Sequence, residues 1–200
     1  MYWFSKILFD YLFAIILLFF LSPIFVICSI IFFIDLKENI FFLQKRQGYK
    51  GKVFRIIKFK TMNNSLDKNG NLKSDRERLT ITGAFARKYS IDELPSLFNI
   101  LLGQMSFVGP RPILAEYDKL YSAEQRKRFL VKPGITGWAQ VNGRNELSWE
   151  EKFKLDIWYI ENRSFFLDLK ILILTIPKVL SREGIAEEDS ATMTIFKGDK

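Results

Sequence analysis

Two adjacent carboxylates, Asp92 and Glu93, are the residues of this sequence best suited to do chemistry. The chain has 200 residues and no histidine, so the commonest general base of enzymes is absent. Its single cysteine, Cys28, lies in an apolar run, where a thiol is usually an inert small hydrophobe. Catalysis by this chain would therefore rest on carboxylates, with a hard metal ion that accepts oxygen ligands as their partner.

A helix cap competes with this catalytic interpretation. Ser90-Ile91-Asp92-Glu93 fits a capping box, in which Ser90 caps the first turn and Glu93 returns to the Ser90 backbone. Such boxes are common, and the local pattern alone favours the cap. The same first turn would also keep Asp92 ionised through the helix dipole, as a nucleophile or metal ligand requires. Neighbouring residues on a helix point about 100° apart, so the two carboxylates can flank one site in different roles.

Several basic residues accompany the acidic pair. Lys58 and Lys60 alternate on a predicted strand, Arg87 precedes the pair by one short segment, and Arg111 and Arg144 lie in loops rich in glycine and proline. Prolines on both sides restrict the backbone of Arg111, and Arg144 ends the glycine-rich segment 133–144. Any one of these cations can be a plain surface charge. Rigid loops that each present an arginine are better explained by phosphate, which a guanidinium binds with two hydrogen bonds. Neither a P-loop nor a Gly-x-Gly-x-x-Gly motif occurs.

The N-terminal region contains a membrane segment. Tyr11 to Ile34 carries no charge, and 24 helical residues span about 36 Å, enough to cross a hydrocarbon core of roughly 30 Å. A secretory signal peptide fits poorly, because the run is too long and no small-residue cleavage site follows it. Lys6 and Asp10 are spaced to pair on the helix just before the run.

The middle of this segment predicts a break. Pro23 cannot donate to the carbonyl of Phe19, and Ser22 can partly repair that loss by bonding a nearby carbonyl. Each half is too short to span a membrane, and basic residues flank both ends: Lys6, Lys37, Lys45 and Arg46. A re-entrant helix broken at Ser22-Pro23, with both ends in the cytoplasm, and an ordinary kinked transmembrane helix both remain open.

The rest of the sequence predicts an α/β fold that is mainly helical with a small β-hairpin. The strands are 41–44 and 53–59, joined through Gly48 and Gly51. Helices are expected from the Ser90 cap to Gly103, over 122–129 with a Ser122/Gln125 box, from Ser148, and from Ser164 to about Leu180. The last two are core helices or amphipathic helices at the membrane interface. The expected division is a membrane helix over 1–38 and a membrane-associated cytoplasmic domain over 39–200.

Charge and cysteine content narrow the classes of function. A formal charge of +8 indicates nucleic acid, anionic lipid or a phosphorylated small substrate as a partner. A single cysteine excludes an internal disulfide framework, and the lack of histidine excludes the usual His/Cys zinc sites.

Four ordered motifs resemble those of the bacterial sugar transferases, the small monotopic phosphoglycosyl transferases. They are Lys58-Phe59-Lys60-Thr61-Met62, Ser90-Ile91-Asp92-Glu93-Leu94-Pro95, Gly109-Pro110-Arg111-Pro112, and Pro133-Gly134-Ile135-Thr136-Gly137 continuing to Arg144. The resemblance runs over nearly the whole chain. Within the family, the chain is most similar to the minimal enzymes that initiate bacterial N-linked glycan assembly.

The resemblance implies a reaction and a set of residue roles. A sugar-1-phosphate would pass from a UDP-sugar to undecaprenyl phosphate with release of UMP, and the sugar would be an N-acetylated amino sugar such as N,N′-diacetylbacillosamine. Asp92 would be the nucleophile of a covalent aspartyl phosphosugar intermediate, and Asp92 and Glu93 would bind Mg²⁺. Lys58, Arg87, Arg111 and Arg144 would bind phosphate and nucleotide.

The resemblance also implies a location and partners. The re-entrant helix would hold the catalytic domain on the cytoplasmic face of the bacterial inner membrane, with no nucleic acid partner. Asp156 and Asp168 fall in segments that resemble the family and are assigned structural roles before catalytic ones.

Two other functions remain open. A non-catalytic, membrane-anchored basic module that binds anionic lipid or nucleic acid would explain the charge, but not the acidic pair or the rigid arginine loops. A direct glycosyl transferase would release UDP instead of UMP.

Overall fold

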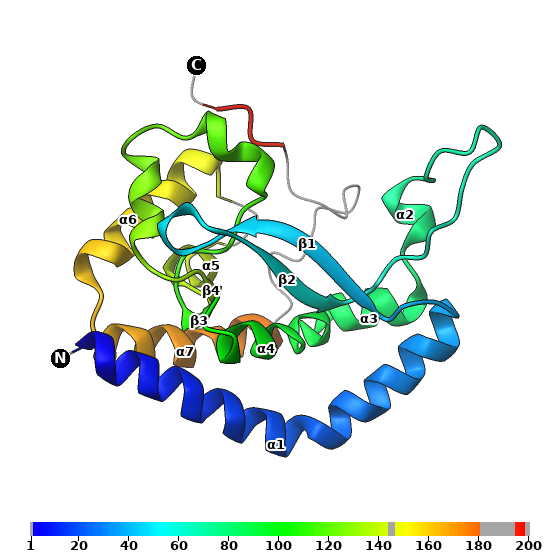
Figure 1. Ribbon diagram of the computed structural model, residues 1–200, viewed down its shortest axis with the longest axis horizontal. Helices are drawn as coiled ribbons and strands as arrows, with labels where there is room; N and C mark the ends of the chain where they lie inside the picture. The colour runs from blue at the N-terminus through cyan, green and yellow to red at the C-terminus, as the bar shows by residue number, and fades with distance from the viewer. Residues whose placement is uncertain (1, 144–146, 181–194, 199–200) are drawn as a thin grey trace.

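The chain is mainly helical and carries two small two-stranded sheets (Figure 1). The computed structural model describes residues 2–143, 147–180 and 195–198. The helices are α1 (Tyr2–Leu36), α2 (Asp75–Arg78), α3 (Ile81–Lys88), α4 (Ser96–Leu101), α5 (Trp138–Val141), α6 (Trp149–Asn162) and α7 (Phe165–Leu180). The strands are β1 (Phe41–Gln47), β2 (Val53–Phe59), β3 (Ser106–Val108) and β4 (Gly134–Thr136). Short 3₁₀ segments are η1 (Tyr49–Gly51), η2 (Ile91–Glu93), η3 (Ala115–Leu120) and η4 (Gln125–Leu130).

The predicted hairpin is confirmed. β1 and β2 pair antiparallel from Phe41↔Phe59 to Gln47↔Val53, with η1 in the turn. β1 is longer than expected, because charged residues continue the strand where the sequence shows no further apolar alternation. The parallel pair β3–β4 was not predicted, since strands of three residues carry no periodic signal.

Helix α1 is continuous through Ser22-Pro23, so the expected break is instead a bend within one helix. Figure 1 shows α1 as an arc along the lower edge of the molecule, with both ends rising toward the other elements. The Ser22 hydroxyl donates to the Phe19 carbonyl at 2.7 Å, the carbonyl that Pro23 leaves without a donor. That repair is the one predicted from the sequence, and it keeps the chain helical.

The start of α1 is tied to α7. Lys6 pairs with Asp168 at 2.6 Å, and Asp168 also accepts hydrogen bonds from the hydroxyls of Tyr2 and Tyr159. The expected Lys6–Asp10 pair is therefore wrong. Asp10 is buried and accepts from the Phe107 amide, because α1 packs against β3 there.

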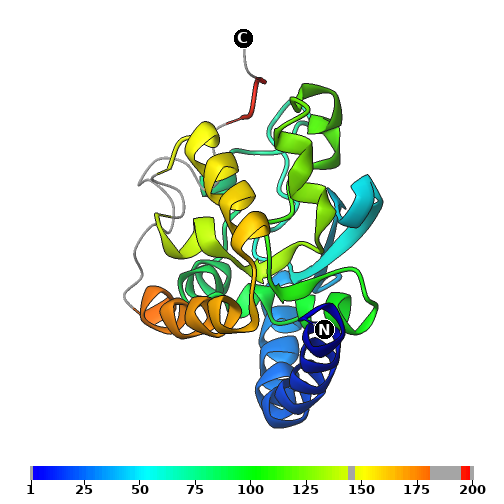
Figure 2. The same cartoon turned by 90° about the vertical axis from the view of Figure 1, so that its left-hand side faces the viewer.

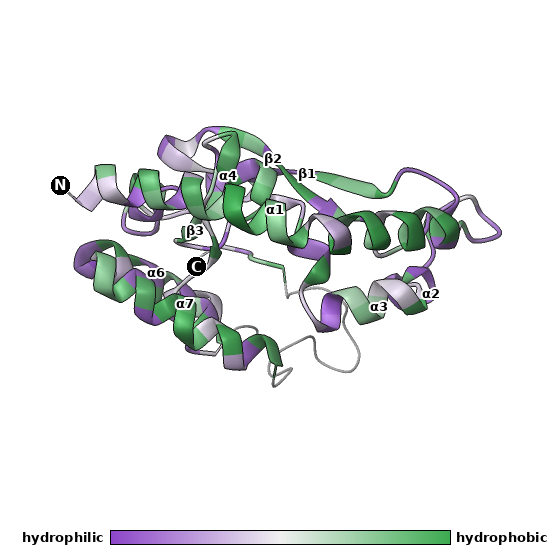
Figure 3. Cartoon of the chain, turned by 90° about the horizontal axis from the view of Figure 1, so that it is seen from below, coloured by the Kyte–Doolittle hydropathy of each residue, from purple (hydrophilic) through white to green (hydrophobic). Residues whose placement is uncertain are grey.

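The lower side of the molecule exposes large apolar side chains. Figure 2 shows α1 and α7 on this side, and Figure 3 shows that many residues of both helices are hydrophobic. Ile81 of α3 is 91% exposed, Phe166 of α7 is 81% exposed, and Phe19 of α1 is 73% exposed. Within the described residues, α1 is the one helix whose length and apolar composition would let it cross a membrane.

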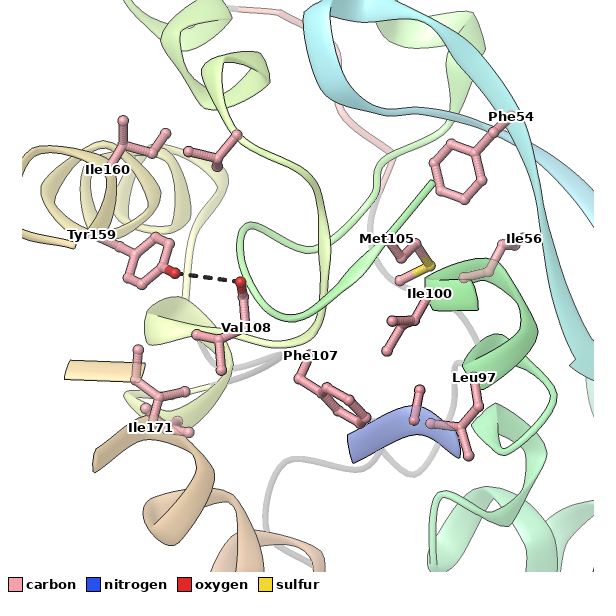
Figure 4. Close-up of a cluster of buried hydrophobic side chains, with 13 residues drawn as sticks. Phe54, Ile56, Leu97, Ile100, Met105, Phe107, Val108, Tyr159, Ile160 and Ile171 are labelled. Carbon is pink, nitrogen blue, oxygen red and sulfur yellow. Dashed lines mark hydrogen bonds between the residues drawn. The ribbon is translucent and has the colours of Figure 1, made fainter. Parts of the chain in front are cut away.

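The core lies between α4, the two sheets and α6 (Figure 4). Its members come from separate parts of the chain and include Ile56, Leu97, Ile100, Phe107 and Tyr159. The Tyr159 hydroxyl donates to the Val108 carbonyl at 3.3 Å, which joins α6 to β3. This core fixes β2, α4 and β3 relative to one another, and each of these elements leads into the candidate site.

Two of the predicted helix starts are confirmed. Ser148 and Glu151 form a capping box at α6, and the Ser164 hydroxyl accepts from the Leu167 amide at the start of α7. Ser122 and Gln125 also exchange the expected hydrogen bonds. They precede the 3₁₀ segment η4, however, and not an α-helix.

Candidate active site

Asp92 and Glu93 lie in the short turn η2, between α3 and α4. Ser90 has a φ of +55° and makes no side-chain cap, so the predicted capping box is wrong. A capping residue needs an extended backbone, and Ser90 is in the left-handed region instead. Helix α4 begins only at Ser96, with Pro95 before it. The dipole of a helix first turn therefore does not act on Asp92 as expected.

Glu93 is held by two cations. Its Oε1 accepts a hydrogen bond from the Lys58 ammonium at 2.6 Å and another from the Arg111 guanidinium at 2.9 Å. Burial would raise the pKa of Glu93, but the charges of Lys58 and Arg111 outweigh it and hold the pKa well below its usual range. Glu93 is thus a permanently ionised link between the strand β2 and the Arg111 loop.

Asp92 interacts less closely with the nearby cations than Glu93 does. Its Oδ2 lies 3.8 Å from the Lys58 ammonium, and no hydrogen bond to its carboxylate occurs among the described residues. Burial raises the pKa of Asp92 to about 6; Lys58 lowers it and the neighbouring Glu93 raises it. A nucleophile needs a free oxygen lone pair, and the Asp92 carboxylate accepts no hydrogen bond among the described residues, whereas Oε1 of Glu93 accepts two.

Lys58 is positioned by polar residues of α4. The Asn99 side chain accepts from the Ile57 amide at 2.9 Å and donates to the Arg55 carbonyl, and the Ser96 hydroxyl donates to the Ile57 carbonyl. These bonds fasten β2 to α4, directly after the acidic pair. Lys60 does not join the site, because it pairs with Glu38 at 2.9 Å.

Arg111 is positioned by the β3–β4 pair and by a buried ion pair. The Gly109 amide donates to the Thr136 carbonyl, and a Cβ at Gly109 would meet the Lys132 carbonyl oxygen at 2.4 Å. The Arg128 guanidinium donates to the Arg111 carbonyl at 2.7 Å and pairs with Asp156 at 2.9 Å. The structural roles expected for Asp156 and Asp168 agree with these contacts.

Arg87 lies in the last turn of α3 and donates from Nε to the Thr61 hydroxyl at 2.9 Å. Burial lowers the pKa of this guanidinium, and the negative charge of Asp92 raises it, so the two groups interact. Of the residues singled out from the sequence, Lys58, Asp92, Glu93 and Arg111 therefore contact one another, and Arg87 interacts with Asp92. Arg144 lies outside the described residues.

One cation of the site was missed. Arg46 lines a small pocket, open to solvent, whose other lining residues include Lys58, Glu93 and Arg111. In the sequence, Arg46 stands out only as a positive charge flanking the membrane segment. Arg46 lies two residues after Gln44, so in a strand both side chains point to the same face. This spacing indicates a strand face, but it does not indicate which group Arg46 binds.

The carboxylates fit a magnesium ion that shares its ligands with substrate. No cluster of three or more acidic, cysteine or histidine side chains suited to a metal occurs among the described residues. Mg²⁺ is commonly held by one or two carboxylates together with phosphate oxygens and water. Asp92, with its uncommitted oxygens, fits this mode, whereas Glu93 already binds two cations through Oε1.

The comparison with known proteins assigns a family. Residues 1–182 match the family described as bacterial sugar transferase. The chain is 52% identical over 193 residues to the uncharacterized sugar transferase EpsL of Bacillus subtilis (strain 168), with 96% of each chain covered.

Two longer relatives carry more specific names. The chain is 37% identical over 191 residues to the UDP-glucose:undecaprenyl-phosphate glucose-1-phosphate transferase of Xanthomonas campestris pv. campestris, covering 90% of this chain and 39% of that protein. It is 38% identical over 199 residues to the undecaprenyl-phosphate glucose phosphotransferase of Komagataeibacter xylinus, covering 90% of this chain and 37% of that protein. The match over almost the full length to the family and to EpsL is decisive: the chain belongs to the bacterial sugar transferase family.

Proposed function

We propose that this protein is a phosphoglycosyl transferase. It transfers a sugar-1-phosphate from a UDP-sugar to undecaprenyl phosphate, releases UMP and so performs the first membrane step of glycoconjugate assembly. The observation that carries this proposal is the difference between the two carboxylates: Glu93 is bonded by Lys58 at 2.6 Å and by Arg111 at 2.9 Å, while Asp92 has only a longer ion pair to Lys58, at 3.8 Å. The names of two relatives support the same type of reaction.

In the first step, an oxygen of Asp92 attacks the β-phosphorus of the UDP-sugar. The bond from that phosphorus to the bridging oxygen breaks, UMP leaves with the bridging oxygen, and an aspartyl phosphosugar forms. Lys58, Arg87 and Arg111 neutralise the charge that develops on the phosphoryl oxygens and on the departing UMP, and Arg144 is proposed to do so as well. No general base is needed, because the attacking group is already an anion.

In the second step, a phosphate oxygen of undecaprenyl phosphate attacks the same phosphorus. The bond to Asp92 breaks, and the carboxylate is restored as the lipid diphosphate sugar leaves. Glu93 keeps Lys58 and Arg111 in place through both steps. A Mg²⁺ ion held by Asp92, with Glu93 beside it, would supply further positive charge to the diphosphate.

The apolar surface supports a site at a membrane. α1, α7 and α3 expose large hydrophobic side chains, and the family and the long α1 helix together support membrane association. We place the catalytic domain on the cytoplasmic face of the inner membrane, where a soluble donor and a lipid acceptor can reach one site. α7 then lies in the interface, as one of the two sequence interpretations expected.

The sugar is proposed from the sequence resemblance as an N-acetylated amino sugar, such as N,N′-diacetylbacillosamine. The two longer relatives are named for glucose, so the donor panel must contain both kinds. Release of UMP from UDP-glucose, UDP-galactose, UDP-N-acetylglucosamine and UDP-N,N′-diacetylbacillosamine identifies the donor.

The test uses the full chain reconstituted with undecaprenyl phosphate and Mg²⁺. The wild type should release UMP and incorporate labelled sugar phosphate into lipid, and Asp92→Asn should lose about 10⁴-fold or more of that rate, because the amide is no nucleophile. Full activity of Asp92→Asn would refute the role of Asp92. Release of UDP would identify a direct glycosyl transferase, and steeply salt-dependent lipid or nucleic acid binding without UMP release would favour the non-catalytic module.

A further inference from the structure

The guanidinium of Arg46 is a partly buried cation in the wall of the pocket beside the acidic pair, which Lys58, Glu93 and Arg111 also line. It donates from Nη1 to the Pro112 carbonyl at 3.2 Å and from Nη2 to the Gln44 side chain at 2.5 Å. Its Nε–H is buried and has no hydrogen-bond partner among the described residues. A buried donor without a partner costs free energy, so a native structure that keeps one normally uses it.

The charge of Arg46 also lacks a partner. No carboxylate lies within ion-pair distance of its guanidinium among the described residues, and the nearby Glu93 is already shared by Lys58 and Arg111. Burial, and then the like charge of Arg111, lower the pKa of Arg46 to about 10, which leaves it charged at neutral pH. Burying an unpaired charge is expensive, so an anion is the expected complement.

The surroundings of Arg46 indicate where that anion sits. Arg46, Lys58 and Arg111 line one cavity, in which Glu93 is the only carboxylate among the described lining residues. The excess of positive charge therefore faces the cavity itself. The end of β1 is fixed there because the Gln47 amide donates to the Ile113 carbonyl and Arg46 forms a β-bridge with Leu114.

We propose that Arg46 is a substrate-binding residue whose guanidinium binds a phosphate oxygen of the anionic substrate in this cavity. The proposal rests on the function proposed above and adds a residue to it. The phosphate can belong to the diphosphate of the nucleotide sugar or to the polyprenyl phosphate acceptor, and the same guanidinium chemistry serves both.

A purely structural role for Arg46 makes a different prediction. Holding the Pro112 carbonyl needs one N–H donor, which a glutamine can supply, and needs no charge. Arg46→Gln therefore separates the two roles, since it keeps a donor and removes the cation. Lys45→Gln is the matched control: Lys45 is the neighbour on the same strand, is exposed, and loses the same charge.

The binding experiment uses the full chain in lipid nanodiscs and titrates UDP, with inorganic pyrophosphate as a second probe. Loss of one charge-assisted hydrogen bond should weaken binding about 10- to 100-fold in Arg46→Gln. Arg46→Lys should recover part of the affinity, and Lys45→Gln should bind as the wild type does. Equal thermal unfolding midpoints for the Arg46 variants and the wild type show that the fold is retained.

A kinetic arm separates the two sources of phosphate. If UDP binding is unchanged but the KM for undecaprenyl phosphate rises about tenfold or more in Arg46→Gln, the ligand is the acceptor phosphate and the proposal stands. If neither UDP affinity nor that KM changes, Arg46 binds no substrate phosphate and the proposal is wrong. Failure of the proposed function looks different: the wild type itself would then release no UMP from any UDP-sugar.

Discussion

Lys58 contacts both members of the acidic pair, but at very different distances. It is 2.6 Å from Glu93 and 3.8 Å from Asp92, and Arg111 adds a second bond to Glu93 alone. Glu93 therefore holds the two cations in place, and Asp92 lies near them with only the longer contact to Lys58. This division explains how adjacent residues of the same chemistry can have opposite shifts in pKa.

The protonation of Asp92 predicts a pH dependence at the residue scale. Asp92 attacks only as the carboxylate, and its pKa is raised to about 6, so kcat/KM should rise as the pH increases through that region. Mg²⁺ favours the ionised form and should move the rise to lower pH. Lys58 lowers the pKa of Asp92, so in Lys58→Gln the rise should occur at higher pH, measured by UMP release across a pH series.

The control for this prediction is Lys60→Gln, which removes a cation that pairs with Glu38, outside the site. Its profile should match the wild type. A Lys58→Gln profile that coincides with the wild type would show that Asp92 is not the group that titrates.

At the scale of elements, α3 must approach the segment after β2 closely to bring Arg87 near Asp92. Gly83 permits this approach, because a Cβ there would lie 2.0 Å from the Thr61 carbonyl oxygen. Thr61 is also the residue whose hydroxyl accepts from Arg87. Gly83 therefore affects the site indirectly, because it allows α3 to lie where Arg87 is near Asp92.

Gly83→Ala should destabilise the protein by about 2–3 kcal/mol, because the clash with a backbone atom outweighs the better helix propensity of alanine. It should also lower UMP release, since α3 and Arg87 must move away from Asp92. Ala84→Ser changes the next, exposed position of the same helix and should leave both nearly unchanged. Thermal unfolding and UMP release measure the two effects, and a wild-type midpoint for Gly83→Ala would contradict the close approach.

For the whole molecule, the contacts at both ends of α1 bear on its topology. Near its start, Lys6 pairs with Asp168 of α7. Near its end, Asp35 accepts a hydrogen bond from Thr82 of α3, and beyond it Glu38 pairs with Lys60. A helix that crosses a bilayer separates its ends by the membrane, so these contacts to one domain support a re-entrant α1 over a spanning one.

Cysteine labelling tests this topology in intact cells. In a Cys28→Ser background, single cysteines at Phe4 and at Asn39 should both be shielded from a reagent restricted to the periplasm, because a re-entrant α1 would leave both of its ends in the cytoplasm. Labelling of both after the cells are opened is the positive control. Periplasmic labelling at Phe4 alone would establish a spanning helix.

Patterns that depend on near neighbours were predictable from the sequence. The apolar run of α1, the hairpin, the Ser148–Glu151 cap and the repair of the Phe19 carbonyl by Ser22 all follow from residues a few positions apart. Predictions that ignored distant partners were wrong. Ser90 and Glu93 have the spacing of a capping box, but Lys58 and Arg111 bind Glu93 more strongly than a cap would, since they are charged.

The sequence by itself determined which chemistry is available to this protein: carboxylates without histidine, cations in restricted segments, and an apolar helix with Ser22-Pro23 in its middle. These depend on residue type and local spacing alone. Only the tertiary structure decided which carboxylate stays free and that Arg46 faces the same cavity as Lys58 and Arg111. Charge pairing acts through space, so a cation 35 positions from its carboxylate leaves no trace in local sequence. Asp92 and Glu93 thus acquire two different roles only once β2, α4 and the β3–β4 loop are packed together.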